Sequence, residues 1–73
     1  MKVLILDEES RLFLAHQGQW TDSAQEARDF AFTLHATAVA RSLNLSKFQV
    51  LFFFPDIDYK IVVATSPVTQ PSK

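Results

Sequence analysis

The stretch WTDSAQEARDFAFTLHATAVARSLNL, residues 20–45, is the segment of this chain with sustained helical character, and it decides the fold. Ser23 followed by Glu26 is a capping-box pattern, in which each side chain satisfies a free backbone N–H group, so a helix is expected to begin near Ser23. Apolar residues then recur at helical spacing along one stripe, formed by Phe32, Ala36, Val39, Ala40 and Leu43. The stretch therefore predicts one helical layer.

This helical layer has two possible arrangements. The residues 30–32 alternate in the manner of an extended connector, and Thr33 is a suitable N-cap, which favours a short helix near 23–28 and a main helix near 33–43. Because neither Pro nor Gly interrupts the stretch, a single long helix is the alternative.

The rest of the chain predicts strands. Runs rich in Val, Ile, Leu and Phe occupy residues 2–7, 11–16, 48–54 and 59–64. A polar turn joins the first pair, and a Pro- and Asp-containing turn joins the second, so both pairs are expected to form antiparallel hairpins. We predict an α+β domain of order β-β-α-β-β, with an antiparallel sheet and a helical layer on one face. The single domain is expected to cover residues 1–65, and residues 66–73 are expected to form a flexible C-terminal tail.

The predicted strands are apolar on both faces, which indicates burial between two layers. One helical layer covers one face, and leaving large apolar side chains in water costs about 1.5–3 kcal/mol each. A second chain is therefore expected to cover the other face, or an edge of the sheet, and a homodimer is the simplest case. Folding of the tail or the aromatic rings over that face is the alternative. The candidate interface residues are Leu4, Leu6, Leu51, Phe53 and Val62.

The sequence predicts no catalytic, cofactor or metal site. The 73 residues contain no Cys, which excludes disulfides and Cys/His zinc sites. His16 and His35 have no acidic residue at a ligand spacing and no nucleophile motif beside them. Asp56 and Asp58 are interpreted as turn-forming residues. An enzyme is therefore not expected.

Charge and hydropathy limit the classes of partner. The net charge of −1 provides no electrostatic attraction to nucleic acid or to an anionic membrane. The aromatic hairpin at 48–64 could stack bases, but Lys60 within it and Lys47 beside it are the only cations there, so nucleic acid is not the expected partner. The initial apolar run is too short for a signal peptide, and no run reaches transmembrane length, which favours a cytoplasmic location.

Part of the chain resembles a group of small bacterial modules that combine a hairpin, a WT dipeptide, an A..F step and an alanine-rich helix before a strand. The resemblance extends over residues 12–50. It is carried by Trp20-Thr21, Ala27-Arg28, Phe30, Ala36, Ala40, Leu43 and Leu45. Such modules are mostly uncharacterised, so the resemblance implies a fold and no catalytic residue.

These observations predict a small, non-enzymatic protein–protein interaction module that self-associates. One alternative is a nucleic-acid-binding module that uses the aromatic hairpin. Another is a ligand-binding or catalytic subunit whose site forms between protomers, near His16 or His35.

Overall fold

The computed structural model describes residues 1–66, and residues 67–73, most of the predicted tail, lie outside the described part. Two strands, β1 (Lys2–Asp7) and β2 (Leu12–Leu14), are followed by a 3-10 turn at His16–Gly18 and by β3 (Trp20–Thr21). The chain continues through α1 (Thr33–Ser42), β4 (Phe48–Phe54), a 3-10 turn at Pro55–Ile57 and β5 (Tyr59–Thr65).

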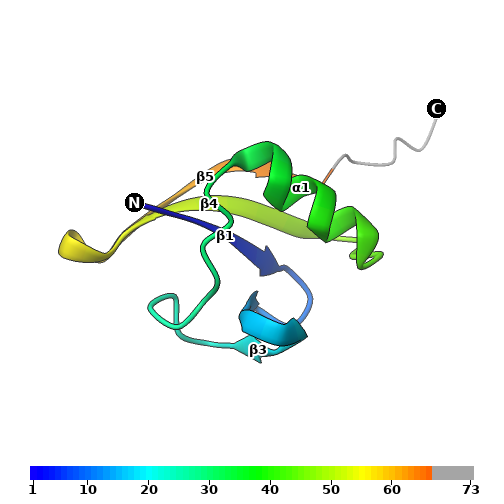
Figure 1. Cartoon of the computed structure of the whole chain (residues 1–73), viewed down its shortest axis with the longest axis horizontal. Coiled ribbons are helices and arrows are strands. Elements are labelled where there is room, and N and C mark those ends of the chain that lie inside the picture. Colours follow the sequence, from blue (N-terminus) through cyan, green and yellow to red (C-terminus); the bar gives the residue numbers. More distant parts are fainter. Residues whose placement is uncertain (67–73) are drawn as a thin grey trace.

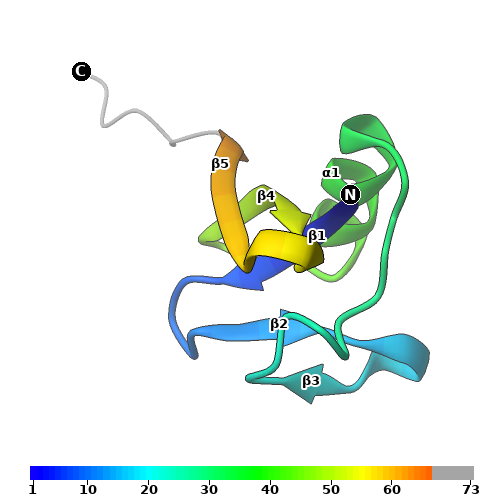
Figure 2. The same cartoon turned by 90° about the vertical axis from the view of Figure 1, so that its left-hand side faces the viewer.

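All strand pairs in residues 1–66 are antiparallel, and the sheet has the order β3-β2-β1-β4-β5 (Figures 1 and 2). The predicted α+β class with an antiparallel sheet is confirmed. The predicted order lacked β3 and extended the second strand to residues 11–16. The chain turns earlier because Gln17 and Gly18 adopt positive φ angles of 59° and 74°, which reverse its direction and allow β3 to pair with β2.

The helix α1 lies over β1 and β4 on one face of the sheet (Figure 1). Ala36 and Ala40 are fully buried against a cluster that includes Val3, Ile5, Phe48 and Val50. Small side chains at these positions let the helix backbone approach the sheet closely. The two ends of the predicted stripe are not buried in this way: Phe32 is 71% exposed and Leu43 is 45% exposed.

The predicted short helix near 23–28 is wrong, and so is the single long helix. Residues 24–26 form a turn, in which the Glu26 N–H donates to the Ser23 carbonyl oxygen at 3.1 Å. The chain then continues without helical structure to Phe32, with a positive φ of 69° at Ala31. Phe32 is the N-cap of α1 in place of Thr33 and makes no side-chain cap bond. The reason is tertiary: the Arg28 and Phe30 amides donate to carbonyl oxygens of β2 and β1, which a helix would prevent.

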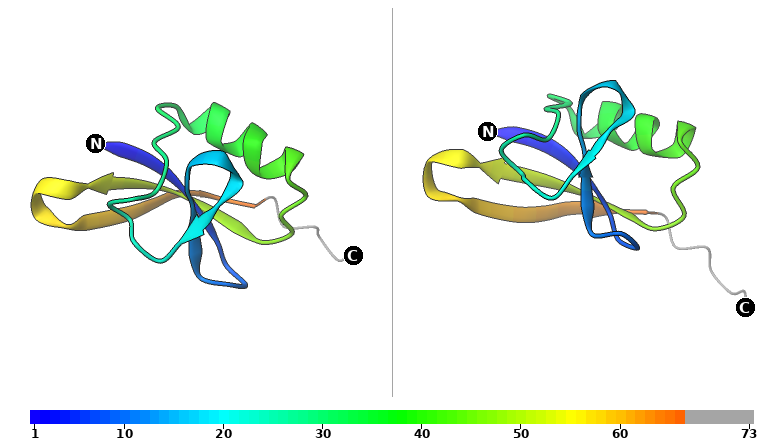
Figure 3. Two further views of the ribbon diagram at one scale, coloured as in Figure 1. Left: turned by 60° about the horizontal axis from the view of Figure 1, so that its bottom comes forward. Right: turned by 90° about the horizontal axis from the view of Figure 1, so that it is seen from below.

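The second face of the sheet is covered by the chain itself. In Figure 3, right, where the molecule is seen from below, the segment between β3 and α1 lies in front of β1 and β4, on the side away from the helix. Ala27 is buried there, and Ala24 packs beside it. The buried cluster on this face consists of Leu4, Leu6, Phe13, Ala27, Leu51 and Phe53. The expectation that a second chain covers this face is corrected, because the segment that was expected to be helical covers it.

Candidate protein–protein interface

The most exposed apolar element of the sheet is β5, which lies at the end of the strand order (Figure 2). Within residues 1–66, no strand pairs with its outer edge. Six of its seven residues are exposed, including Tyr59 at 51%, Ile61 at 44% and Val62 at 45%. A long apolar edge strand is a template for pairing with another strand. We call the outer edge of β5, with the side chains of Tyr59, Ile61, Val62 and Val63, the β5 edge surface.

Hydrogen bonds around Val3 establish which backbone groups face which strand. The Val3 N–H donates to Asp29 Oδ1, and the Val3 carbonyl oxygen accepts the Phe30 N–H, both at 2.9 Å. The polar backbone groups of Val3 therefore point away from β4. Val3 lies opposite Phe52 in the register, and in such an antiparallel pair the groups of both residues point outward. The N–H and carbonyl groups of Phe52 therefore point toward β5.

The register between β4 and β5 extends this alternation to the edge. Phe52 lies opposite Ile61, so these two residues form a hydrogen-bonded pair. Because successive residues of a strand point their amides in opposite directions, the amides and carbonyls of Lys60 and Val62 point away from β4. The edge of β5 thus presents backbone donors and acceptors beside exposed apolar side chains.

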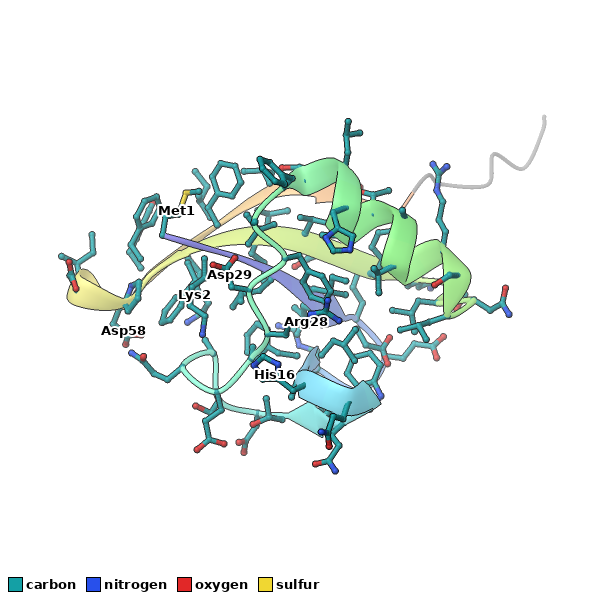
Figure 4. The ribbon with its side chains drawn as sticks, in the orientation of Figure 1. Met1, Lys2, His16, Arg28, Asp29 and Asp58 are labelled. Carbon is teal, nitrogen blue, oxygen red and sulfur yellow. The ribbon has the colours of Figure 1, made fainter. Side chains whose placement is uncertain are left out.

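The side chains near the hairpin tip extend the apolar character of this region. The rings of Tyr59 and Phe54 pack with centroids 6.2 Å apart. The hairpin projects beyond the N-terminal end of α1, and Met1, 60% exposed, lies on the helix side of the sheet (Figures 1 and 4). The ammonium group of Lys60, the one charged residue of β5, lies 5.5 Å from the centre of the Phe53 ring. Asp56 and Asp58 sit in the turn, which does not favour a nucleic-acid phosphate.

The structure separates the five predicted interface residues. Leu4 and Phe53 are 0% exposed, and Leu6 and Leu51 are at most 6% exposed, so their side chains cannot contact another chain in this fold. Val62 is the one of the five that lies on the β5 edge surface. The sequence reasoning missed Tyr59, Ile61 and Val63. The signal for them was the run of three β-branched residues at 61–63, in the last predicted strand of the chain.

The two histidines, His16 and His35, lie on different elements of the fold. His16 is exposed in the 3-10 turn after β2. His35 lies in the first turns of α1, with Nδ1 3.2 Å from the Phe30 carbonyl oxygen and its ring edge-on to the Phe30 ring. Among residues 1–66, no three His, Asp or Glu side chains are grouped to hold a metal ion. The contacts of His35 are those of a packing residue at a helix start.

The Asp29 side chain accepts a hydrogen bond from the backbone at the start of β1 (Figure 4). One of its oxygens accepts both the Val3 N–H and the Ala31 N–H at 2.9 Å. The bond from Val3 is the main reason that the pKa of this carboxyl lies below its ordinary value; burial opposes the shift, and the Ala31 bond and the Lys2 charge reinforce it. Lys2 Nζ in turn donates to the Gln25 carbonyl oxygen at 2.9 Å. These bonds fasten the segment between β3 and α1 to the sheet.

The lowered pKa of Asp29 predicts a pH-dependent loss of stability. Because the carboxyl binds a proton more weakly in the folded state, its contribution is complete above the unfolded pKa of 3.8 and is lost as the pH falls through the folded pKa below it. Asp29→Asn is expected to lower the free energy of unfolding by about 1 kcal/mol at pH 7. In urea titrations, its deficit in unfolding free energy relative to the natural chain should stay constant above the unfolded pKa of 3.8 and shrink as the pH falls below that value.

The exposed Asp56→Asn is the matched control, because it removes a carboxylate without removing an observed hydrogen bond. Its free energy of unfolding should be close to that of the natural chain at both neutral and acid pH. A deficit of Asp29→Asn that stays constant from neutral to acid pH would mean that the charge of Asp29 does not fasten this segment.

Among the described residues, no helix has the length and apolar character needed to span a membrane. Comparison of the chain with protein-family models, curated proteins and solved structures finds no match. The fold and the β5 edge surface are therefore the basis for assigning a function.

Proposed function

We propose that this chain is a small, non-enzymatic protein–protein interaction module that self-associates through the β5 edge surface, most simply as a homodimer. The observation that carries the proposal is the outer edge of β5, which pairs with no strand of residues 1–66, with Ile61 and Val62 each close to half exposed. Monomeric proteins generally shield such edges with charges, prolines or short strands. Here β5 has seven residues, no proline and one charge, that of Lys60.

Charge supports a second copy as the partner. The net charge of −1 means that two copies repel each other only weakly. The same apolar strand is available on each copy, and a two-fold dimer brings the same surface of both copies together. The cytoplasm is the compartment that we propose, on the sequence grounds given above.

Sedimentation equilibrium of the full-length chain over a wide range of concentration tests this proposal. The expected result is a mass that rises from 8.3 kDa toward twice that value as the concentration increases. A mass that stays at 8.3 kDa at the highest concentration would contradict self-association.

A further inference from the structure

We infer that the second copy adds its β5 antiparallel to the β5 of the first copy, with the two-fold axis beside Ile61, so that the two sheets become one continuous sheet. This inference rests on the proposed function and specifies its geometry. It follows from the direction of the backbone groups, the position of the charge and an irregularity in the pairing of β5.

Symmetry limits the possible registers. A two-fold axis perpendicular to a continuous sheet keeps each face on the same side in both copies. Side chains that lie directly opposite each other must belong to the same face, and a slip of one residue would exchange the faces. The axis must therefore pass beside a residue that lies opposite itself in the partner. Lys60, Ile61 and Val62 are the central candidates on β5.

An axis beside Lys60 is unfavourable, because it would place two ammonium-bearing side chains directly opposite each other. An axis beside Val62 is unfavourable for a different reason. Val62 pairs with Leu51, whereas Ala64 pairs with Val50, so the strand has one extra residue at 63. Such a bulge interrupts the ladder. With the axis beside Val62, both copies would bring the bulge next to the centre of the interface.

An axis beside Ile61 avoids both problems. It places Lys60 of each copy opposite Val62 of the partner, and these are the residues whose amides and carbonyls point outward. Each of the two pairs can exchange two backbone hydrogen bonds. Ile61 then lies opposite Ile61 of the partner in the closely spaced type of pair, with Cα atoms about 4.5 Å apart. Lys60 keeps its ammonium group over the Phe53 ring, on the other face from Ile61.

Single-cysteine variants test this geometry in the full-length chain, because the natural sequence contains no Cys. A disulfide needs Cα atoms about 4.4–6.8 Å apart, which matches the expected spacing at Ile61. Ile61→Cys should form a covalent dimer rapidly under mild oxidation, seen as a doubled mass on a non-reducing gel. Ile61 is 44% exposed, so the substitution is expected to leave the fold of each copy intact.

Two matched variants serve as controls. In Val62→Cys the two thiol-bearing residues are diagonal neighbours, about 7–8 Å apart, and the disulfide should form at least about tenfold more slowly. Leu34→Cys, on the outer face of α1 at a position that is 85% exposed, reports the rate of random collision. Sedimentation of each variant under reducing conditions shows whether it associates before oxidation.

The outcomes separate the inference from the proposed function. Faster crosslinking at Val62 than at Ile61 would overturn the register. Crosslinking of both variants at the Leu34→Cys rate, in chains that sediment as dimers, would overturn edge pairing and leave self-association intact. Monomeric sedimentation of the natural chain would overturn both.

Discussion

Replacing Ile61 with lysine is expected to leave the chain monomeric at concentrations where the natural chain is dimeric. Ile61 is 44% exposed, so dimerisation can bury close to half of each side chain, about 1 kcal/mol per copy. Losing about 2 kcal/mol weakens the dimer about thirtyfold. The two new ammonium groups would also lie directly opposite each other, which weakens pairing further. Sedimentation equilibrium of the full-length variant measures the change.

Leu34→Lys is the matched control for this variant. It makes the same change of net charge, from −1 to 0, at a position on α1 that is 85% exposed and distant in sequence from β5. It should associate as the natural chain does. Equal dissociation constants for Ile61→Lys and the natural chain would show that β5 does not form the contact.

Replacing Phe53 with alanine is expected to cost about 3–5 kcal/mol of unfolding free energy, because its ring is fully buried with Leu4 and Leu51. A domain of this size has a total stability of roughly 4–11 kcal/mol, so this loss is a large part of the whole. Phe53→Asp would place an unpaired carboxylate in the same position and should not fold. Urea unfolding followed by circular dichroism measures both effects.

Val62→Ala is the control, since Val62 pairs with Leu51, two residues before Phe53 on β4, and is 45% exposed. This variant should lose less than about 1 kcal/mol of unfolding free energy. If Phe53→Ala instead kept the stability of the natural chain but lost self-association, Phe53 would lie in the interface, as the sequence alone suggested, and the observed core would be wrong.

The sequence predicts the long elements well because their side-chain patterns are local. The strands β1 and β4 have the predicted bounds, and α1 ends one residue before the predicted 33–43. The strands β1 and β4 are short, nearly continuous apolar runs bounded by polar or turn residues, and α1 has apolar residues at helical spacing. The strand β3 was missed because two residues, Trp20 and Thr21, are too few to show alternation.

The segment after β3 could not be predicted in this way, because distant partners determine its structure. Ser23 and Glu26 match a helix start locally, but the Phe30 amide bonds to Val3 and Asp29 accepts the Val3 N–H. These bonds join residues more than 25 positions apart. Tertiary hydrogen bonding therefore overrides the local helical pattern.

The interface residues could not be selected from sequence for a related reason. Apolar side chains on both faces of a strand show that two layers cover it, but they do not show whether the second layer belongs to the same chain. Here Ala24 and Ala27 supply it. The position of β5 at the edge depends on strand order, which the alternation of residues does not encode.

Amide hydrogen exchange of the natural full-length chain at low and high concentration tests the role of the β5 edge most directly. The amides of Lys60 and Val62 point away from β4, whereas Ile61 already pairs with Phe52. If two copies pair through this edge, exchange at Lys60 and Val62 slows markedly as concentration rises, with a much smaller change at Phe30, whose amide bonds within the chain. Exchange at Lys60 and Val62 that is independent of concentration, while the mass doubles, would place the contact on another surface and contradict the account.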